Sequence, residues 1–405
     1  MLVDADRALY ESHPDLGLVL GNASALISAA LDSSTELVSG ARPVQVRFVP
    51  GRSVVAQFSA SVTTGDGDVS VATFVASVGR KVAEGTAIVS SGGTNVAIWR
   101  LPDDPFLPGL RSVASPDLAG RLLEQLGVDS TGLTLRRRAY RPGRRAVMEL
   151  RTPGDRVFAK VVRPAQVAEL QSLHASLVSQ APIPMSLGWS EASGIAMLQA
   201  LEGHSLRTAV DKGGAPLPSP GSLLDLLGTL EGVRGRSRPQ PRLVDRATDH
   251  AIFIGTVHPE LRPRVQGLAQ SIEDMATPER QRTIHGDFHS SQIMVRGGTI
   301  KGLVDIDTVG SGERTDDLAN LLAHLAALAS AKPTLAHAAA SYGADLINGF
   351  DVVTNPRQLR LRVAAALLGF GGGPFRVQEP QWRTATEERV RLAEQWMDTA
   401  AAISM

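Results

Sequence analysis

A short stretch in the second half of the chain combines side chains suited to phosphoryl transfer. The stretch runs from His285 to Gln292, and two aspartates, Asp305 and Asp307, follow it. Phosphoryl transfer needs a base that orients the attacking hydroxyl, together with oxygen ligands for a divalent metal. Asp287 stands five residues before the amide of Gln292, and Asp305 follows an apolar run. That spacing suits a catalytic base followed by two metal ligands.

A β-hairpin would bring the candidate metal ligands together. Residues 293–295 and 300–304 are apolar, and the glycine-rich residues 296–299 between them signal a turn. Strand pairing then places Gln292 roughly opposite Asp305, where both can reach one Mg²⁺ ion, which prefers oxygen ligands. Asp307 lies two residues after Asp305, on the same side of an extended segment, so either carboxylate could hold the metal, and Asp307 is either a second ligand or a solvated neighbour.

The loop His285-Gly286-Asp287 resembles the catalytic loop of the aminoglycoside phosphotransferase and choline kinase superfamily. That superfamily usually has Asn where this chain has Gln292, and the combination with His289 is similar to the bacterial maltokinase and glucosamine-kinase-like branch. The resemblance covers roughly residues 130 to 400. It implies an ATP-dependent enzyme that uses Mg²⁺, with Asp287 as catalytic base, Asp305 as principal metal ligand, and His285 and Asp317 supporting the loop. GTP remains an open alternative as donor.

A rare lysine marks the expected nucleotide site. Only five of the 41 basic residues are lysine, and Lys160 lies in the apolar strand 157–162. By analogy to kinases, Lys160 contacts the α- and β-phosphates and pairs with a helix glutamate, for which Glu169 is the nearest candidate. The alternatives are that Lys160 reaches along its strand to solvent and that Glu169 is a solvated surface residue. The other expected nucleotide-binding residues are Tyr140, Gly143 and Arg144 in a phosphate loop, and Gln199 and Leu201 in the hinge.

An internal repeat organises the first half of the chain. Residues 46–55 and 138–147 each contain an aromatic residue, a Pro-Gly-Arg turn and a strand. Only the second copy is followed by a strand lysine, so it is the expected nucleotide-binding copy. We predict an α+β protein with a bilobal, protein-kinase-like fold and an additional small-lobe-like domain at the N-terminus. The expected domains are residues 1–115 (a cap domain), 116–202 (the nucleotide-binding small lobe) and 203–405 (the helical large lobe). Ser115 and Pro116 are expected to open the first helix of the small lobe, which Gly127 ends, and a further helix is expected within residues 164–179.

The large lobe is expected to be helical and to bind the acceptor. Apolar periodicity predicts helices at 223–233, 244–275, 317–330, 335–350, 359–368 and 386–401. In the superfamily the acceptor lies between the catalytic loop and the C-terminal helices. Trp382, Glu387 and Glu388 are therefore candidate acceptor residues, although acidic side chains on helices more often form a solvated face.

The composition excludes several classes of function. The chain has 405 residues, a net charge of zero from 41 basic and 41 acidic groups, and no cysteine. Disulfides, thiolate metal sites and a cysteine nucleophile are excluded, and the charge balance gives no reason to expect nucleic acid or a membrane as partner. The acidic start does not resemble a signal peptide, and the uncharged run 16–31 is too short to span a bilayer. We expect a cytoplasmic enzyme, and the sequence does not indicate its oligomeric state.

Three functions are compatible with these residues. The first is a kinase that phosphorylates a hydroxyl of a small molecule, with a sugar or amino sugar favoured by the Gln-type loop and the extra N-terminal domain. The second is an aminoglycoside phosphotransferase. The third is a pseudokinase that binds a nucleotide in a regulatory role, which the replacement of Asn by Gln292 would allow. A protein kinase is disfavoured, because no segment resembles an activation loop that ends in Ala-Pro-Glu.

Overall fold

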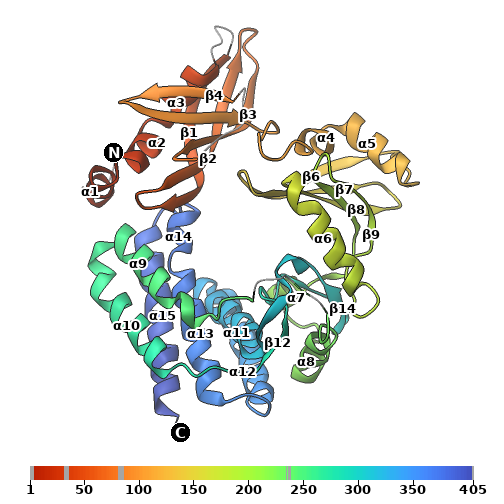
Figure 1. Cartoon of the computed structure of the whole chain (residues 1–405), viewed down its shortest axis with the longest axis vertical. Helices are drawn as coiled ribbons and strands as arrows, with labels where there is room; N and C mark the ends of the chain where they lie inside the picture. The colour runs from red at the N-terminus through yellow and green to blue at the C-terminus, as the bar shows by residue number, and fades with distance from the viewer. Residues whose placement is uncertain (1–3, 32–35, 81–85, 234, 236–238, 404–405) are drawn as a thin grey trace. The chain divides into compact units, whose positions relative to one another are not determined.

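The structure is a computed structural model that describes residues 4–31, 36–80, 86–233, 235 and 239–403 (Figure 1). The chain divides into two compact units. The first unit comprises Met1–Ala168, Ser186–Gln199 and Phe375–Pro380, and the second comprises Glu169–Met185, Ala200–Pro374 and Gln381–Met405. Lys160 therefore belongs to the first unit, and Asp287, Gln292 and Asp305 belong to the second.

The first unit begins with three helices and a five-stranded antiparallel sheet. The helices are α1 (Asp4–Ser12), α2 (Pro14–Gly21) and α3 (Ala23–Leu31). The sheet has the order β1-β2-β3-β5-β4, formed by β1 (Glu36–Val49), β2 (Ser53–Thr64), β3 (Val69–Val78), β4 (Ala87–Ser91) and β5 (Thr94–Arg100). Alternate residues of β2 from Val54 to Val62 are buried, the pattern expected where one face of a strand is covered. Helices α2 and α3 lie against these strands.

A second sheet in the first unit repeats this topology. Its order is β6-β7-β8-β10-β9, the same as in the first sheet, and it is formed by β6 (Thr134–Arg141), β7 (Arg145–Arg151), β8 (Arg156–Val162), β9 (Ser186–Ser190) and β10 (Ile195–Gln199). Both Pro-Gly-Arg segments form the predicted hairpin turns. Their glycines, Gly51 and Gly143, have φ angles of 66° and 62°, which glycine adopts without strain. The sequence repeat is thus confirmed as a repeated hairpin.

Helices α4 (Leu110–Ala114) and α5 (Pro116–Gln125) connect the two sheets along the chain. As predicted, Ser115 caps α5 and Gly127 follows its end with a φ of 73°. A single apolar core contains Val75 and Trp99 from the first sheet, Leu123 from α5 and Met148 from the second sheet. Helix α6 (Pro164–Leu177) then follows β8, within the range predicted for it.

The second unit is mainly helical, with two small sheets. The sheets are β11-β13-β14, formed by β11 (His204–Ser205), β13 (Ile293–Arg296) and β14 (Thr299–Leu303), and β12 (Gln281–Ile284) paired with β15 (Gly310–Glu313). The helices are α7 (Leu206–Lys212), α8 (Pro220–Gly228), α9 (Ala247–Val257), α10 (Arg262–Met275), α11 (Arg314–Ala331), α12 (Ala336–Phe350), α13 (Pro356–Phe370) and α15 (Trp382–Ala402), and the short α14 (Gly373–Arg376) passes into the first unit.

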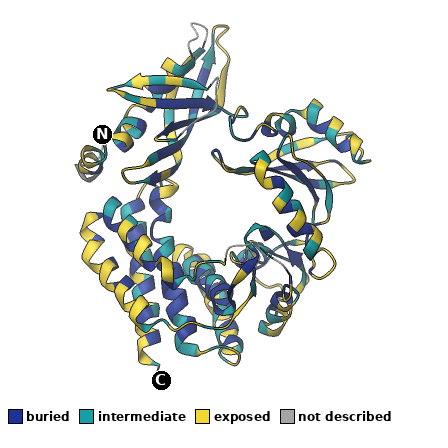
Figure 2. Ribbon diagram, in the orientation of Figure 1, coloured by how far each residue is buried: buried dark blue, intermediate teal, exposed yellow. Residues whose placement is uncertain are grey.

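One predicted helix is wrong, because residues 244–275 form two α-helices rather than one. Helix α9 ends at Val257, and α10 begins at Arg262 after a short 3₁₀ turn at Pro259–Leu261. A proline within a helix lacks the N–H and clashes with the preceding turn, so Pro259 breaks the helix. Helix α13 is buried on nearly all sides and packs against α11 and α15, as its dark blue ribbon in Figure 2 shows.

Within the described ranges, no single helix is both long and apolar enough to cross a bilayer, although the bent pair Pro14–Gly21 and Ala23–Leu31 passes that test when taken together.

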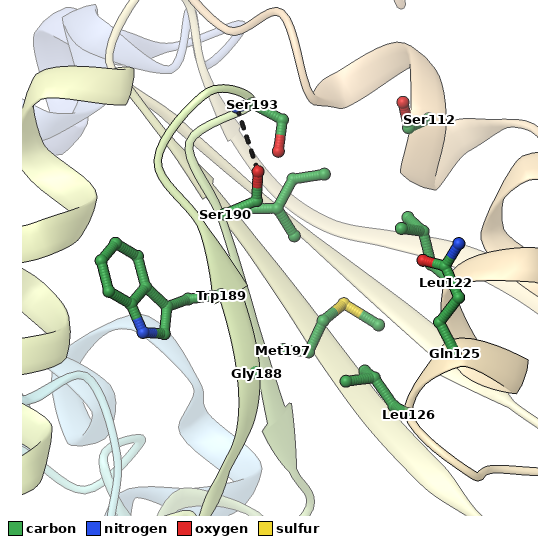
Figure 3. Close-up of a pocket in the computed structure, with 10 residues that line it drawn as sticks. Ser112, Leu122, Gln125, Leu126, Gly188, Trp189, Ser190, Ser193 and Met197 are labelled. Atoms are coloured by element: carbon green, nitrogen blue, oxygen red, sulfur yellow. Dashed lines mark hydrogen bonds between the residues drawn. The ribbon is translucent and has the colours of Figure 1, made fainter.

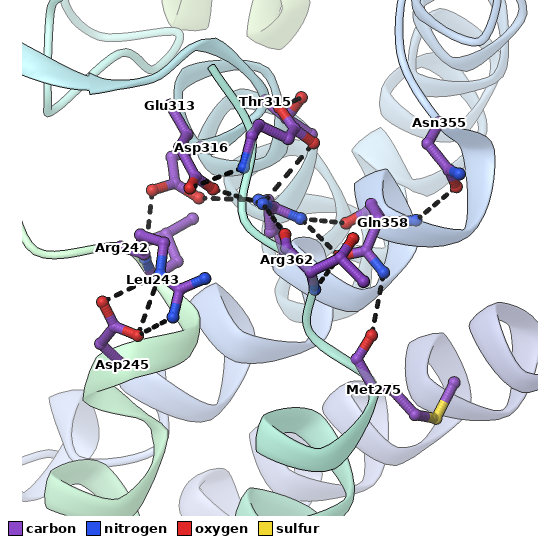
Figure 4. Close-up of polar contacts among 12 residues, drawn as sticks. Arg242, Leu243, Asp245, Met275, Glu313, Thr315, Asp316, Asn355, Gln358 and Arg362 are labelled. Carbon is purple, nitrogen blue, oxygen red and sulfur yellow. Dashed lines mark hydrogen bonds and ion pairs between the residues drawn. The ribbon is translucent and has the colours of Figure 1, made fainter. Parts of the chain in front are cut away.

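A fully buried arginine ties α13 to the beginning of α11 (Figure 4). The guanidinium of Arg362 pairs with Glu313, which is also buried, and lies 3.2 Å from a carboxylate oxygen of Asp316. It also donates to the side-chain oxygen of Gln358 at 2.8 Å and to the carbonyl of Thr277 at 3.0 Å. Buried charges need such partners, because leaving one unpaired costs several kcal/mol.

We predict that Arg362→Met lowers the free energy of unfolding by about 3–5 kcal/mol, because two buried carboxylates then lose their cation. Urea denaturation of the purified variant measures this loss. Arg264→Met is the matched control: its pair with Glu394 is largely exposed, so its loss should be about 1 kcal/mol or less. Equal losses in the two variants would show that burial does not determine the strength of the Arg362 pairing.

Candidate active site

The predicted hairpin forms and brings Gln292 next to Asp305. Strands β13 and β14 are antiparallel and turn between Arg296 and Thr299. At the open end of the hairpin, the N–H of Val304 donates to the carbonyl of Gln292 at 2.9 Å. The side-chain amide of Gln292 lies 3.5 Å from a carboxylate oxygen of Asp305. The hairpin prediction is thus confirmed at the register that the site requires.

The backbone after the hairpin differs from the prediction. Asp305 adopts a left-handed conformation, with a φ of 60° and a ψ of 48°, and Ile306–Thr308 forms a 3₁₀ turn. The expectation that Asp305 to Asp307 is an extended segment is therefore wrong. A non-glycine residue in this conformation costs of order 1 kcal/mol, and such strain often occurs at functional sites. The turn, rather than strand alternation, determines where Asp307 points.

The backbone of the His285-Gly286-Asp287 loop is bonded to a buried carboxylate. Asp317, in the first turn of α11, accepts hydrogen bonds from the N–H groups of His285 at 2.7 Å and Gly286 at 2.8 Å. Burial raises the pKa of Asp317 to about 7, although the two hydrogen bonds act in the opposite direction and lower it. Gly286 has a φ of 77°, which lets the loop turn here. The family resemblance implies this supporting position for Asp317.

The ring of His285 joins the loop to the end of the hairpin. Its Nε2 lies 3.1 Å from the carbonyl of Val304, and its Nδ1 accepts the N–H of Asp287 at 3.3 Å. These contacts need the neutral ring with its proton on Nε2. Burial favours that form, since it lowers the pKa of His285 to about 4. The ring of His285 thus braces the loop against the end of the hairpin.

Asp287 lies in the wall of a cavity of about 210 Å³ within the second unit. Its side chain is 41% exposed, whereas Asp316 and Asp317 in the same wall are buried. The remaining lining residues come from four separate segments: Gln240, Pro241, Leu243, Arg246, His250, Ile284, Gly286, Asn320, His324, Ala366, Gly369 and Phe370. Asp287 is therefore the accessible carboxylate in this cavity, as a base that acts on a bound hydroxyl must be.

The surroundings of Gln292 fit a magnesium ion. Burial lowers the pKa of His289 to about 4, so its ring is neutral, and Ser291 donates to Nδ1 at 3.2 Å. The ring proton is then on Nε2, 3.2 Å from the side-chain nitrogen of Gln292, which cannot accept it. The same nitrogen lies 3.5 Å from a carboxylate oxygen of Asp305. Exchanging the nitrogen and oxygen of the amide would let the oxygen accept the ring proton and face Asp305, and a hard cation would bridge such a pair of oxygens.

The predicted nucleotide-binding residues lie partly in each unit. Lys160 is buried on β8, between Val147 of β7 and Ala196 of β10. Glu169 is exposed on the part of α6 that belongs to the second unit, so its pairing with Lys160 stays a prediction. Gln199 ends β10 in the first unit, and Leu201 follows in the second.

The side chain of Tyr140 is part of the core. Its hydroxyl donates to Asp104 at 2.8 Å and accepts from the indole N–H of Trp99 at 3.1 Å. Burial raises its pKa, and the Asp104 carboxylate raises it further. Asp104 also accepts the N–H of Gly143 at 2.7 Å. A nucleotide contact in this loop would therefore come from its backbone or from Arg144, which is exposed.

The predicted acceptor residues lie on α15. Trp382 is buried, with its ring edge-on to His258 at 6.1 Å, and Glu387 lies 3.1 Å from Nε2 of the same histidine. Glu388 is exposed. None of the three is among the residues that line the cavity beside Asp287.

The sequence analysis named Asp317 of α11 but missed Asn320 and His324, which face this cavity from the same helix. Asp317, Asn320 and His324 are spaced three and four residues apart, so they share one face of the helix. His324 stacks on His289 at 4.1 Å and contacts Phe370 at 4.6 Å, and Asn320 donates to the carbonyl of Phe288 at 3.2 Å. The polar periodicity within an otherwise apolar helix is the signal that could have identified them.

Another cavity, of about 350 Å³, lies in the first unit between α5 and the β9-β10 hairpin (Figure 3). Leu122, Leu126 and Met197 line it together with hydroxyl and amide groups, and Figure 3 shows Trp189 directed away from Met197. None of the residues lining this cavity carries a carboxylate, imidazole or cationic group, so it does not suit phosphoryl transfer.

This chain belongs to the phosphotransferase enzyme family, whose model matches residues 123–361. The matched range contains both Lys160 and the loop around Asp287. The protein is therefore an enzyme of the small-molecule kinase type, with an α+β fold. A search among curated proteins finds no significant match.

Several solved structures are similar to this chain at low sequence identity. A choline/ethanolamine kinase family protein from Mesorhizobium loti has 15% identity over 72% of this chain and 93% of its own, with a TM-score of 0.47. Macrolide 2'-phosphotransferase MphH from Brachybacterium faecium has 17% identity over 68% of this chain and 98% of its own, with a TM-score of 0.42. A thermostable mutant of aminoglycoside phosphotransferase APH(4)-Ia, in complex with ADP and hygromycin B, has 13% identity over 70% and 98%, with a TM-score of 0.48.

We predict that His324 makes the protein less stable in mild acid. Burial lowers the pKa of His324 from its ordinary value of 6.5 to about 3. Between these values the unfolded chain binds a proton that the folded chain excludes, so stability present above pH 6.5 is lost as the pH falls toward 3. The melting temperature of the wild type should therefore fall between pH 7.5 and 5.0, and His324→Phe should reduce that fall. An identical fall in both proteins would contradict the assignment.

Proposed function

We propose that this protein transfers the γ-phosphoryl group of ATP, with Mg²⁺, to a hydroxyl of a single-ring sugar or amino sugar. The observation that carries the proposal is the grouping of Asp287, Gln292 and Asp305 around His289, beside a cavity that Asp287 lines. This grouping offers a base, two oxygen ligands and a space for an acceptor, which are the parts that phosphoryl transfer requires.

Each residue of the site has a separate role in the proposed reaction. Asp287 orients the acceptor hydroxyl and takes its proton as the oxygen attacks the phosphorus atom. Gln292 and Asp305 would hold Mg²⁺, with Asp307 as a candidate second carboxylate. When bound, Mg²⁺ neutralises the negative charge on the phosphate oxygens. His285 and Asp317 hold the loop so that Asp287 keeps its position, which matters because small displacements of reacting groups are costly.

The nucleotide is assigned to the second sheet of the first unit. Lys160 would contact the α- and β-phosphates, and the turn at Gly143 and Arg144 would cover them. Backbone groups near Gln199 and Leu201 would bind the adenine ring. The first sheet has the same strand order without a lysine at this position, so we propose that it serves as a scaffold or cap. Use of ATP also supports a cytoplasmic location for the reaction.

The cavity supports a small, hydroxyl-rich acceptor. Its volume of about 210 Å³ lies below the range of roughly 300–1,000 Å³ that is typical of sites for drug-sized ligands. The rings of His324 and Phe370 offer a surface for a sugar ring, and Gln240, Asn320 and His250 offer hydrogen bonds. These features favour a sugar over an aminoglycoside.

The acceptor is identified by measuring ADP release with Mg-ATP and a panel of compounds. The panel contains glucose, maltose, glucosamine, two aminoglycosides and choline, and a parallel series replaces ATP by GTP. We expect turnover with a sugar or amino sugar. Turnover with aminoglycosides alone would overturn the proposed acceptor. Nucleotide binding without turnover on any acceptor would instead support a regulatory, non-catalytic role.

We predict that Asp287→Asn lowers kcat by about 10²–10⁴-fold, because the amide cannot take the proton of the acceptor. The dissociation constant for Mg-ATP should change little, since Asp287 is expected to contact the acceptor and not the nucleotide. Steady-state kinetics and calorimetric titration measure the two quantities. A collapse of nucleotide affinity would assign Asp287 to nucleotide binding instead.

Asp305→Asn is expected to weaken Mg²⁺-dependent nucleotide binding by at least tenfold while leaving the binding of metal-free ATP unchanged. The reason is that the carboxylate supplies the negative charge that a divalent cation requires. Titration of ATP with and without Mg²⁺ separates the two effects. Asp307→Asn in the same assay tests the second carboxylate, and an unchanged magnesium dependence in Asp305→Asn would refute its role as principal ligand.

A further inference from the structure

Six arginines gather around the second Pro-Gly-Arg turn, all within the first unit. Three belong to the turn itself and are Arg141, Arg144 and Arg145. The others are Arg47 in β1, Arg80 after β3 and Arg163 after β8. Both strand repeats therefore contribute to one cluster. The proposed reaction does not use Arg47, Arg80 or Arg163.

Direct contacts place Arg80 and Arg163 at the turn. Arg163 donates through Nε and Nη2 to the carbonyl of Gly143, at 2.8 and 2.7 Å. The guanidinium groups of Arg80 and Arg163 both lie over the ring of Phe106, at 5.2 and 5.0 Å from its centre. A Cβ atom added to Gly143 would lie 3.3 Å from Nη1 of Arg80. Two cations thus share one aromatic ring beside the turn.

Among the residues that the structure describes, Asp104 is the carboxylate that acts on Arg80 in this cluster. Partial burial and the guanidinium groups of Arg47, Arg141, Arg145 and Arg163 lower the pKa of Arg144. Partial burial, Arg163 and Arg47 lower the pKa of Arg80, and Asp104 opposes them. The carboxylate of Asp104 already accepts hydrogen bonds from Tyr140, Gly143 and Phe106. Neighbouring guanidinium groups repel one another because they carry like charges, and an anion bound among them would offset that repulsion.

Arg80 also carries a donor without a partner. Its Nη1 atom is buried and has no hydrogen-bond partner among the residues that the structure describes. A buried donor left unsatisfied costs roughly 1–3 kcal/mol, more when it is charged. The oxygens of a phosphate group are the acceptors that a guanidinium fork matches best.

The cluster lies on the side of the second sheet opposite Lys160. Val157, Ala159 and Val161 of β8 belong to the apolar core that Phe106 packs against, and Lys160 alternates with them, so it points to the other face. Arg80 and Arg163 contact Phe106 and so lie on the core side. An anion held by Arg80 and Arg163 is therefore separated by the sheet from one held by Lys160.

We propose that Arg80, Arg163 and Arg47 form a second anion site, which binds a small molecule carrying one or more phosphate groups. Such a ligand neutralises the cluster, satisfies Nη1 of Arg80 and connects the first strand repeat to the turn at Gly143. Because this turn is the proposed phosphate loop, the bound anion would change how tightly the loop is held and thus the affinity for the nucleotide.

The site is tested by titrating metal-free wild-type protein with pyrophosphate by calorimetry at low salt, with glucose 6-phosphate as a second probe. Binding of pyrophosphate alone would indicate a polyphosphate ligand, and binding of the phosphorylated sugar would indicate a metabolite. We expect Arg80→Gln and Arg47→Gln to raise the dissociation constant at least tenfold. We expect Lys160→Met and the control Arg151→Gln, at the far end of β7, to leave it unchanged.

Melting temperatures separate this role from a purely structural one. Without an anion, Arg80→Gln should melt at the same temperature as the wild type or higher, since the change relieves repulsion, but the stabilisation by pyrophosphate should disappear. A variant that melts lower and keeps the full stabilisation would overturn the proposal. Loss of pyrophosphate binding in Lys160→Met, or absence of binding of both probes to the wild type, would also overturn it.

Discussion

The buried acidic residues at the beginning of α11 are the interaction on which the active site depends. Within five residues, Glu313 and Asp316 pair with the buried Arg362, and Asp317 accepts the backbone N–H groups of the catalytic loop. The first pairing fixes the end of the helix against α13, and the second fixes the loop against the helix. Buried charges hold their geometry firmly, because any movement leaves a charge without a partner. Asp287 is thereby positioned through the backbone of its own loop.

The same helix determines what the site can hold. Asn320 and His324 follow Asp317 on one face of α11 and line the cavity beside Asp287. His324 stacks on His289, whose neutral ring in turn orients the amide of Gln292 toward Asp305. The cavity beside Asp287 and the candidate metal site are therefore connected through two stacked imidazoles. Burial keeps both rings neutral, so this connection does not depend on pH in the neutral range.

Local signals in the sequence predicted the features that short segments determine. The hairpin between Gln292 and Asp305 and the cap of α5 at Ser115 depend on neighbouring residues, and both formed as predicted. The left-handed Asp305 was not predicted, because tertiary contacts around it hold the strained backbone. The cavity was missed for a related reason: its wall comes from segments about 130 residues apart, and no local pattern joins them. The core position of the Tyr140 side chain likewise depends on Trp99 and Asp104, about 40 residues earlier.

The duplicated sheet is physically joined to the loop that it precedes. Trp99 at the end of the first sheet donates to Tyr140, and Asp104 in the following linker accepts from both Tyr140 and Gly143. The turn at Gly143 is therefore supported from the N-terminal side of the chain as well as by its own sheet. A change in the first repeat alters the support of this turn directly, through bonds of about 3 Å or less, and no motion across the molecule is needed. This explains physically how a sheet without a lysine of its own can influence the turn proposed to cover the nucleotide.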